Sequence, residues 1–271
     1  MRKICLVVIL SLFFWGCNSK KENQLANDFV IETNYGNIKI HLYDETKLHK
    51  ENFNHWVKEG FYNDMKFHRV IKDFMIQIGD VEYKKNCTDA ELEQYNYTFP
   101  SEIKTPQLFH KRGAIAAART PDEYNPHKES SSTQFYIVTG RKFTNEELDI
   151  IEDESYKENV QKELKKLFDI NGVRIQKLIE EGNDEELDLL QEEIVTKAED
   201  LVALDTSFLF TDIQRSEYIN RGGAPFLDGK YTVFGEVVEG MDVVERISQV
   251  SVNDSDEPLE EVKIIKIKVE K

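Results

Sequence analysis

Eight short runs of strand-forming residues, each bounded by turn residues, make up most of the chain outside its central part. They lie at residues 29–33, 38–43, 66–71, 75–79, 113–118, 134–139, 233–238 and 262–269. The last run alternates between apolar and polar residues, which is typical of a strand with one buried face. Many short strands with turn signals favour a β-sandwich or a barrel. Residues 46–59 instead have the spacing of an amphipathic helix, which Gly60 would end.

Residues 141–221 differ from the rest of the chain in period and in charge. They contain 11 basic and 22 acidic residues, a net −11 out of −16 for the whole chain. Thr144 and Glu147 have the spacing of a capping box at a helix start. Gly182 would end a second helical run, and a third would follow it. Because each run is amphipathic, each must bury an apolar stripe. We therefore predict a compact acidic α-helical subdomain inserted between residues 28–140 and 222–271, with a last short helix near residues 212–220.

Composition excludes two classes of partner. The 271 residues are 40% apolar, enough for a real core and one or two domains. The net charge of −16 argues against a nucleic acid, because phosphate contacts need clustered lysine and arginine. An anionic membrane surface is disfavoured for the same reason.

Residues 1–17 have the form of a bacterial lipoprotein signal. Met1 to Lys3 is basic, residues 4–15 are apolar apart from one serine, and Gly16 precedes Cys17. The apolar stretch is too short to span a bilayer of about 30 Å as a helix. We expect cleavage before Cys17, lipidation of Cys17, and a polar tether over residues 18–27. The protein would then be a periplasm-facing lipoprotein, anchored to a membrane of the cell envelope. An ordinary signal peptide with a chance cysteine is the alternative.

The remaining cysteines and the histidines indicate no further site. Cys5 lies in the signal and Cys17 would be acylated, so Cys87 has no partner for an intramolecular disulfide in the mature chain. The histidines show no metal-ligand spacing, and we expect no metal site.

The segment 67–80 sets one arginine and one glutamine among large apolar residues. Arg69 and Gln77 stand between phenylalanine, methionine, valine and isoleucine side chains. Charged and amide groups survive near a core only when they have partners. A pocket with an apolar floor and one fixed guanidinium would suit a neutral substrate whose polarity changes slightly in the transition state.

This segment resembles the signature of the cyclophilin family of peptidyl-prolyl cis-trans isomerases. Two further segments agree with it and follow in family order: residues 113–119 continued by 131–139, and residues 226–235. The resemblance covers roughly residues 28–140 and 222–270. It implies a mainly β fold, an eight-stranded antiparallel barrel capped by two helices. It also implies catalysed rotation about X–Pro bonds, here in exported proteins, with no cofactor and no covalent intermediate.

The same resemblance implies roles for individual residues. Arg69 matches the catalytic arginine, which would donate a hydrogen bond to the proline nitrogen, and Gln77 matches the amide that helps to position it. The residues that match the substrate-binding pocket and its neighbouring groove are Phe74, Met75, Ala118, Arg119, Gln134, Tyr136, Phe226, Leu227 and Tyr231. We interpret His68 as a structural hydrogen-bonding residue, because this reaction transfers no proton.

Four of these residues depart from the family pattern. Arg119 stands where an asparagine is common, and Phe226 replaces a tryptophan of many members. Tyr136 adds a hydroxyl to a phenylalanine position, and Tyr231 stands where a histidine is common. None of these changes removes the arginine or the apolar pocket.

The inserted helices leave alternatives open. The barrel could serve as a proline-peptide-binding chaperone or scaffold module, with the insertion recruiting a protein partner. Acidic helices are most often a solvated face, and the insertion could also fold over the groove and narrow the choice of substrate. Proline-containing polypeptides are the expected clients under every alternative.

Overall fold

A curled antiparallel sheet forms the body of the molecule. The computed structural model describes residues 25–84 and 87–270, so residues 1–17, Cys17 and most of the tether lie outside the described residues. The strands are β1 (Asp28–Thr33), β2 (Gly36–Leu42), β3 (Arg69–Ile71), β4 (Met75–Ile78), β5 (Thr98–Phe99), β6 (Ala114–Ala117), β7 (Ser130–Ser131), β8 (Phe135–Val138), β9 (Val233–Glu239) and β10 (Ile264–Val269). Eight of them form one sheet in the order β10-β1-β2-β9-β6-β8-β4-β3, and β5 pairs with β7.

The two edges of this sheet meet. The amide of Phe67 donates to the carbonyl of Val262 at 2.9 Å, and the amide of Ile264 donates to the carbonyl of Met65 at 2.9 Å. These bonds join the segment before β3 to the start of β10 and the residues just before it, so the sheet closes on itself. The expected eight-stranded antiparallel barrel is thus confirmed, and closure leaves few open strand edges.

Two helices cover the barrel, as expected. Helix α1 (Lys47–Lys58) buries Phe53 and Trp56, and α6 (Met241–Ser248) buries Val244 and Ile247. Both helices contribute to one large apolar core with the inward faces of the strands. The remaining short elements on the barrel are η1 (Val81–Tyr83), α2 (Asp89–Tyr95) and η2 (Pro225–Leu227).

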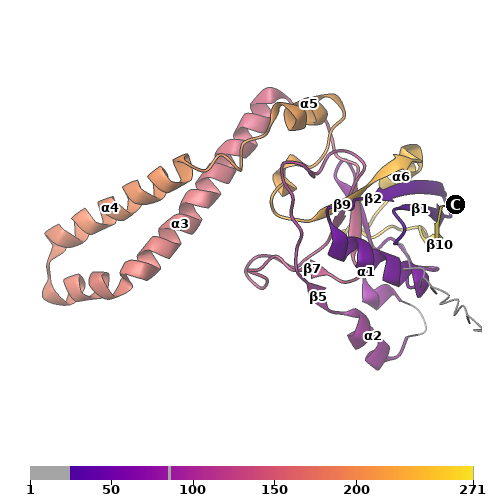
Figure 1. Cartoon of the computed structure of the whole chain (residues 1–271), viewed down its shortest axis with the longest axis horizontal. Helices are drawn as coiled ribbons and strands as arrows, with labels where there is room; N and C mark the ends of the chain where they lie inside the picture. Colours follow the sequence, from indigo (N-terminus) through magenta and orange to yellow (C-terminus); the bar gives the residue numbers. More distant parts are fainter. Residues whose placement is uncertain (1–24, 85–86, 271) are drawn as a thin grey trace, which may run out of the picture.

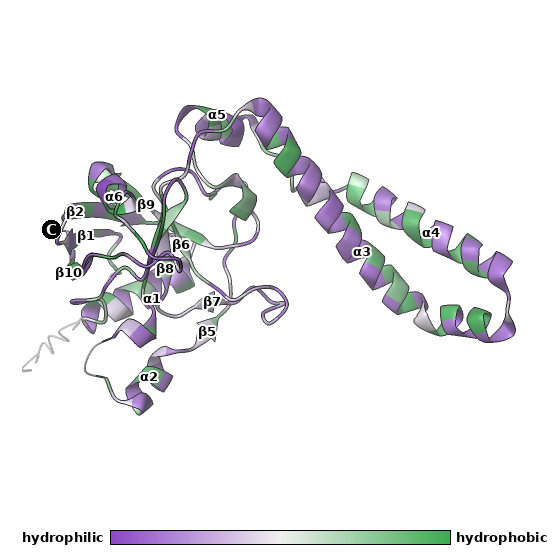
Figure 2. Ribbon diagram, turned by 180° about the vertical axis from the view of Figure 1, so that it is seen from behind, coloured by the Kyte–Doolittle hydropathy of each residue, from purple (hydrophilic) through white to green (hydrophobic). Residues whose placement is uncertain are grey.

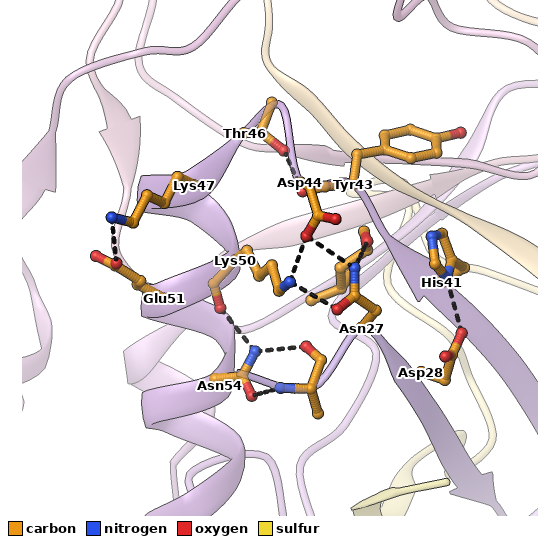
Figure 3. Close-up of polar contacts among 12 residues, drawn as sticks. Asn27, Asp28, His41, Tyr43, Asp44, Thr46, Lys47, Lys50, Glu51 and Asn54 are labelled. Carbon is orange, nitrogen blue, oxygen red and sulfur yellow. Dashed lines mark hydrogen bonds and ion pairs between the residues drawn. The ribbon is translucent and has the colours of Figure 1, made fainter. Parts of the chain in front are cut away.

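The entering chain is tied to α1 by polar contacts (Figure 3). The buried Lys50 donates to the side-chain oxygen of Asn27 at 2.6 Å and to Asp44 at 2.5 Å. Asn54 pairs with the backbone of Ala26 through two bonds of 2.9 and 3.0 Å. Residues 26 and 27, the end of the predicted tether, are therefore fixed to the barrel.

The insertion is an extended helical hairpin rather than a compact subdomain (Figure 1). Helix α3 (Asn145–Glu181) and α4 (Asp184–Ala203) lie side by side and project from the barrel, and α5 (Asp212–Asn220) leads back to it. The prediction of two helices before Gly182 is wrong, because α3 runs unbroken through Gly172. The predicted capping box is present: the amide of Glu147 donates to Thr144 Oγ1 at 3.2 Å, and the amide of Thr144 donates to Glu147 Oε2 at 2.9 Å.

Apolar side chains hold the hairpin together and attach it to the barrel. Within the hairpin, α3 and α4 share a buried cluster of Leu167, Leu178, Leu190, Ile194 and Ala198. Figure 2 shows that hydrophobic and hydrophilic residues alternate along both helices. A second cluster at its base joins Phe109 of the barrel to Phe143, Leu148 and Tyr218. Within the described residues, neither these helices nor any other is both long and apolar enough to cross a membrane.

Candidate functional site

Strand pairing places Arg69 and Gln77 side by side on the outer face of the barrel. The two residues are direct partners in the β3–β4 ladder. Their neighbours Val70 and Ile76 are also partners and point into the core. Because side chains alternate along a strand, the same two strands supply both core and site.

Glycine at the end of β4 keeps this strand close to its neighbour. Gly79 has a φ of +101°, and a Cβ atom there would lie 2.1 Å from the carbonyl oxygen of Thr133. Any other residue would push the segment before β8 away, so Gly79 helps to set the distance between Gln77 and Gln134.

A pocket of about 140 Å³ lies beside Arg69. Its lining residues are Arg69, Phe74, Met75, Gln77, Ala118, Arg119, Tyr136, Leu227 and Tyr231. All of these were predicted as site residues, and they come from four separated parts of the chain. The floor belongs to a small apolar cluster that is distinct from the barrel core and includes Met75, Ala116 and Val233.

Two predicted site residues do not line this pocket. Gln134 lies behind it, where its Oε1 accepts a hydrogen bond of 2.9 Å from Gln77 Nε2. This bond orients the Gln77 amide. Phe226 packs against Phe74 with ring centroids 5.3 Å apart, and it faces the larger cavity beyond.

The guanidinium of Arg69 is only loosely held. Its side chain is 45% exposed, and its one ion pair among the described residues runs from Nε to Asp256 Oδ2 at 3.4 Å. Most of its donors therefore face the pocket mouth or solvent, where a ligand can use them.

Arg119 is held rigidly in the wall. Its side chain is only 4% exposed, Nε donates to the carbonyl of Lys230 at 2.8 Å, and Asp122 lies 2.6 Å from its terminal nitrogen. The guanidinium carbon lies 4.6 Å from the ring centroid of Tyr231. Arg119 thus uses its fork and its flat face to fix the loop that carries Tyr231.

A buried hydrogen-bond network connects the pocket wall to the insertion. The hydroxyl of Tyr136 lies 3.0 Å from His110 Nε2, and His110 Nδ1 lies 2.9 Å from Asp228 Oδ1. Two α5 side chains, Gln214 and Tyr218, donate to Asp228 Oδ2 at 2.9 and 2.6 Å. His110 and Asp228 were not predicted as site residues. The signal was the hydroxyl of Tyr136, which requires a partner when buried.

The two tyrosines of this network are not suited to proton transfer near neutral pH. Burial raises the pKa of Tyr136 well above its usual value, and the neighbouring Tyr231 and Asp228 add to the effect. Burial also raises the pKa of Tyr218. Among the described residues, no cluster of acidic, histidine or cysteine side chains could hold a metal ion.

His68 differs from its predicted role. Its ring stacks on Tyr83, with centroids 5.4 Å apart, and its buried Nδ1 has no hydrogen-bond partner among the described residues. Burial lowers the pKa of His68. The stacking on Tyr83 is therefore the contact that the structure shows for this ring, and Nδ1 does not make the expected hydrogen bond.

Comparison with known proteins gives a consistent assignment. A family model described as cyclophilin type peptidyl-prolyl cis-trans isomerase matches residues 29–160 and 211–269. The Acinetobacter baylyi peptidyl-prolyl cis-trans isomerase is 39% identical over 126 residues, which cover 45% of this chain and 60% of that protein. A Staphylococcus aureus protein named as a candidate peptidyl-prolyl cis-trans isomerase is 28% identical over 254 residues, 93% of this chain and 96% of its own length.

Other relatives are similar over different shares of their length. Peptidyl-prolyl cis-trans isomerase-like 2 of Rhizopus delemar is 26% identical over 240 residues, and the chain spans only 28% of that protein. A cyclophilin type isomerase of Cryptosporidium parvum, crystallised in the presence of the dipeptide Ala-Pro, has the same fold. It is 17% identical with a TM-score of 0.51, covering 90% of this chain and 99% of that one.

Proposed function

Because the chain belongs to the family of cyclophilin-type peptidyl-prolyl cis-trans isomerases, we propose that it accelerates rotation about X–Pro bonds in polypeptide clients. The proline ring of the client would occupy the pocket of Phe74, Met75, Tyr136 and Leu227. Arg69 would donate a hydrogen bond to the proline nitrogen. The observation that supports this proposal most is the convergence of Arg69 and Gln77 on one apolar pocket.

The reaction requires the protein to stabilise a twisted amide, and it requires no covalent chemistry. Amide resonance gives the uncatalysed rotation a barrier of about 18–20 kcal/mol. In the twisted transition state the nitrogen lone pair is no longer shared with the carbonyl, so the nitrogen accepts a hydrogen bond better. A donor aimed at that nitrogen stabilises the transition state more than the ground state, and only this difference accelerates the step. Neither a covalent intermediate nor a proton transfer is needed.

The geometry of the site suits each part of this mechanism. An arginine guanidinium offers donors in a rigid fork, and those of Arg69 are not consumed by strong partners. Gln77, oriented by Gln134, would bind a carbonyl of the client beside the arginine. The Cryptosporidium parvum relative was crystallised with a dipeptide that contains proline, which supports proline as the occupant here.

The cellular setting is part of the proposal. The signal-like residues 1–17 favour clients that are themselves exported, met by a lipid-anchored enzyme that faces the periplasm. No cofactor takes part in the reaction.

Replacing Arg69 with alanine tests the mechanism. We expect kcat/KM for a proline peptide, measured by NMR exchange, to fall by about ten- to a thousandfold, because one transition-state donor is lost. Arg69→Lys should recover part of the activity, since it keeps a donor but not the rigid fork. The fold should persist, because the side chain is exposed and makes one 3.4 Å ion pair.

A matched control is Arg174→Ala. This arginine of α3 is 52% exposed and also forms one ion pair, with Glu186. It should leave kcat/KM unchanged. Undiminished turnover by Arg69→Ala would exclude the proposed mechanism.

A further inference from the structure

A second cavity, of about 220 Å³, lies between the insertion and the barrel. Four parts of the chain line it: one face of α3, the segment that joins α4 to α5, α5 itself through Gln214, and barrel loops that include η2. The lining residues are Thr105, Lys128, Ser155, Glu158, Asn159, Lys162, Asp205, Ser207, Phe208, Leu209, Phe210, Gln214, Pro225, Phe226, Asp228, Gly229 and Lys230. Because α3 and the α4–α5 segment belong to the insertion, a barrel without it would lack this cavity.

This cavity adjoins the proline pocket. Phe226 lines the cavity, while the next residue, Leu227, lines the pocket. Phe226 is 43% exposed and rests on Phe74, so it forms a ridge between the two. An extended chain advances about 3.3–3.6 Å per residue, so a polypeptide with its proline in the pocket crosses this ridge within a few residues.

The carboxylates of the cavity are all engaged within the protein. Glu158 lies between Lys162 and Lys230, at 2.8 and 2.7 Å, and these hydrogen bonds lower the pKa of Glu158 to about 2. Asp228 is buried in the network with His110 and α5. Asp205 accepts a bond of 2.8 Å from the amide of Ser207.

The cations of the cavity keep donors to spare. The ammonium groups of Lys128, Lys162 and Lys230 each make one hydrogen bond within the described part of the chain. An ammonium has three N–H groups. Lys128 is half-buried and bonds only to the carbonyl of Gly229, at 3.0 Å, with no carboxylate partner among the described residues.

The surroundings of Lys128 are positively charged as well as buried. Burial lowers the pKa of Lys128. The nearby Asp122 raises this pKa, while Lys162, Arg119 and Lys230 lower it further. A wider, open recess of about 850 Å³ shares Lys128, Lys162 and Asp205 and adds Lys165, Lys166, Asp122 and Glu163. Salt screens charges beyond about 8 Å, so these nearby charges, rather than the net charge of −16, determine the field that a ligand meets here. Among the lysines that also line the cavity, Lys128 is the one without a carboxylate partner among the described residues.

We propose that this cavity, formed by Lys128, Lys162 and Lys230 beside the ridge of Phe226, is a second client-binding site for acidic side chains that flank the proline. The ligand is a polypeptide segment with Asp or Glu within a few residues of its X–Pro bond. The carboxylates take up the free lysine donors, and the apolar pocket takes up the proline ring. The insertion thereby sets which X–Pro bonds are preferred. This inference rests on the isomerase function proposed above.

Three proline peptides of equal length test it. One carries Gln-Gln on both sides of the X–Pro unit, one carries Glu-Glu before it, and one carries Glu-Glu after it. NMR exchange is the suitable assay, because a coupling protease would itself discriminate between charges. We expect one acidic peptide to have a kcat/KM about three- to tenfold above that of the neutral peptide, through a lower KM. The advantage should disappear in about 0.5 M NaCl.

Variants test whether the lysines of the cavity cause the preference for acidic peptides. In the double variant Lys128→Gln, Lys162→Gln, the ratio between the acidic and neutral peptides should fall to about one. The double variant Lys177→Gln, Lys197→Gln makes the same charge change on α3 and α4, at positions outside the cavity, and should keep the ratio. Equal rates for the three peptides on the wild-type protein, or a ratio that survives in the Lys128→Gln, Lys162→Gln variant, would overturn the proposal.

Failure of the proposed isomerase function can be distinguished from failure of the second-site proposal. If no peptide is isomerised, the proposed function fails, and fluorescence anisotropy with labelled peptides decides on the cavity alone. Tighter binding of a Glu-Glu peptide than of the Gln-Gln peptide by the wild-type protein, but not by the Lys128→Gln, Lys162→Gln variant, supports the second site. Equal affinities contradict it.

Discussion

His49 is a buried imidazole that the sequence pattern did not distinguish from an ordinary surface histidine. Its side chain is 2% exposed, Nδ1 lies 2.7 Å from Glu102, and Nε2 lies 2.9 Å from Ser130. Its ring also contacts Phe99 and Phe234, with centroids 4.6 and 5.7 Å away. Burial lowers the pKa of His49, and this effect outweighs the nearby carboxylate, which raises it.

The depressed pKa of His49 predicts a pH-dependent stability. Below about pH 6.5 the unfolded chain protonates this histidine while the folded chain resists, so the unfolded state binds more protons. The stabilisation is fully present above about pH 6.5 and is lost as the pH falls towards the folded pKa. Urea unfolding should therefore give a lower free energy of unfolding at about pH 5.5 than at about pH 7.5.

Two single variants test whether His49 causes this pH dependence of stability. His49→Gln should weaken it, although not abolish it, because burial also lowers the pKa of His68. His127→Gln, at an exposed position, should leave it intact. The pH range from about 5.5 to about 7.5 stays above the ordinary pKa of glutamate, so protonation of Glu102 does not contribute to the pH dependence. An identical pH dependence for His49→Gln and the wild type would contradict this account.

Individual side chains mark the limit of sequence reasoning about the site. Arg69 and Gln77 could be predicted, because a charged group and an amide set among large apolar residues need partners and because their segment resembles a family signature. Phe226 could not be placed, because the 3-10 turn of η2 makes Phe226 line the larger cavity while Leu227 lines the proline pocket. The stacking of Arg119 on Tyr231 joins residues 112 positions apart, and no local pattern encodes it.

At the scale of elements, α5 reaches the proline pocket through Asp228 and His110. A hydrogen bond removed at the α5 end leaves the buried Asp228 short of a donor, at a cost of about 1–3 kcal/mol. The His110–Tyr136 contact at the other end then loses part of its support. The insertion and the pocket wall are thus linked by chemistry as well as by chain connection.

A double-mutant cycle measures this link. Tyr218→Phe should lower kcat/KM by about two- to tenfold in the wild-type background, because the pocket wall is less firmly held. In a Tyr136→Phe background the same change should have a clearly smaller effect, since the last bond of the network is already absent. Tyr156→Phe, on α3 and without a bond to Asp228, serves as the matched control. Effects that simply multiply would exclude coupling between α5 and the pocket.

Helix ends were more predictable than helix continuity. The capping box of Thr144 and Glu147 and the stop at Gly182, with its φ of +65°, both follow from local chemistry. Gly172 disfavours a helix by only about 1 kcal/mol. Packing of Leu167 and Leu178 of α3 against α4 outweighs that cost, and such packing is invisible in a local pattern.

At the scale of the whole molecule, the barrel could be predicted from the sequence and the placement of the insertion could not. The barrel was predictable because closing eight short strands is one of few ways to bury their apolar faces. The projection of the hairpin was not, because it depends on apolar contacts at one base, around Phe143 and Tyr218. The described chain enters at β1, on the side of the barrel away from the hairpin (Figure 1).

Lipidation of Cys17 is the remaining prediction at this scale. Cells supplied with radiolabelled palmitate should incorporate label into the wild-type protein, because acyl chains on Cys17 would provide the anchor. Cys17→Ser should abolish the label, whereas Cys87→Ser should retain it. Label is a sharper measure than membrane fractionation alone, since an uncleaved signal could hold the Cys17→Ser protein at the membrane. An unlabelled wild-type protein, or a labelled Cys17→Ser variant, would show that an ordinary signal peptide is the better interpretation of residues 1–17.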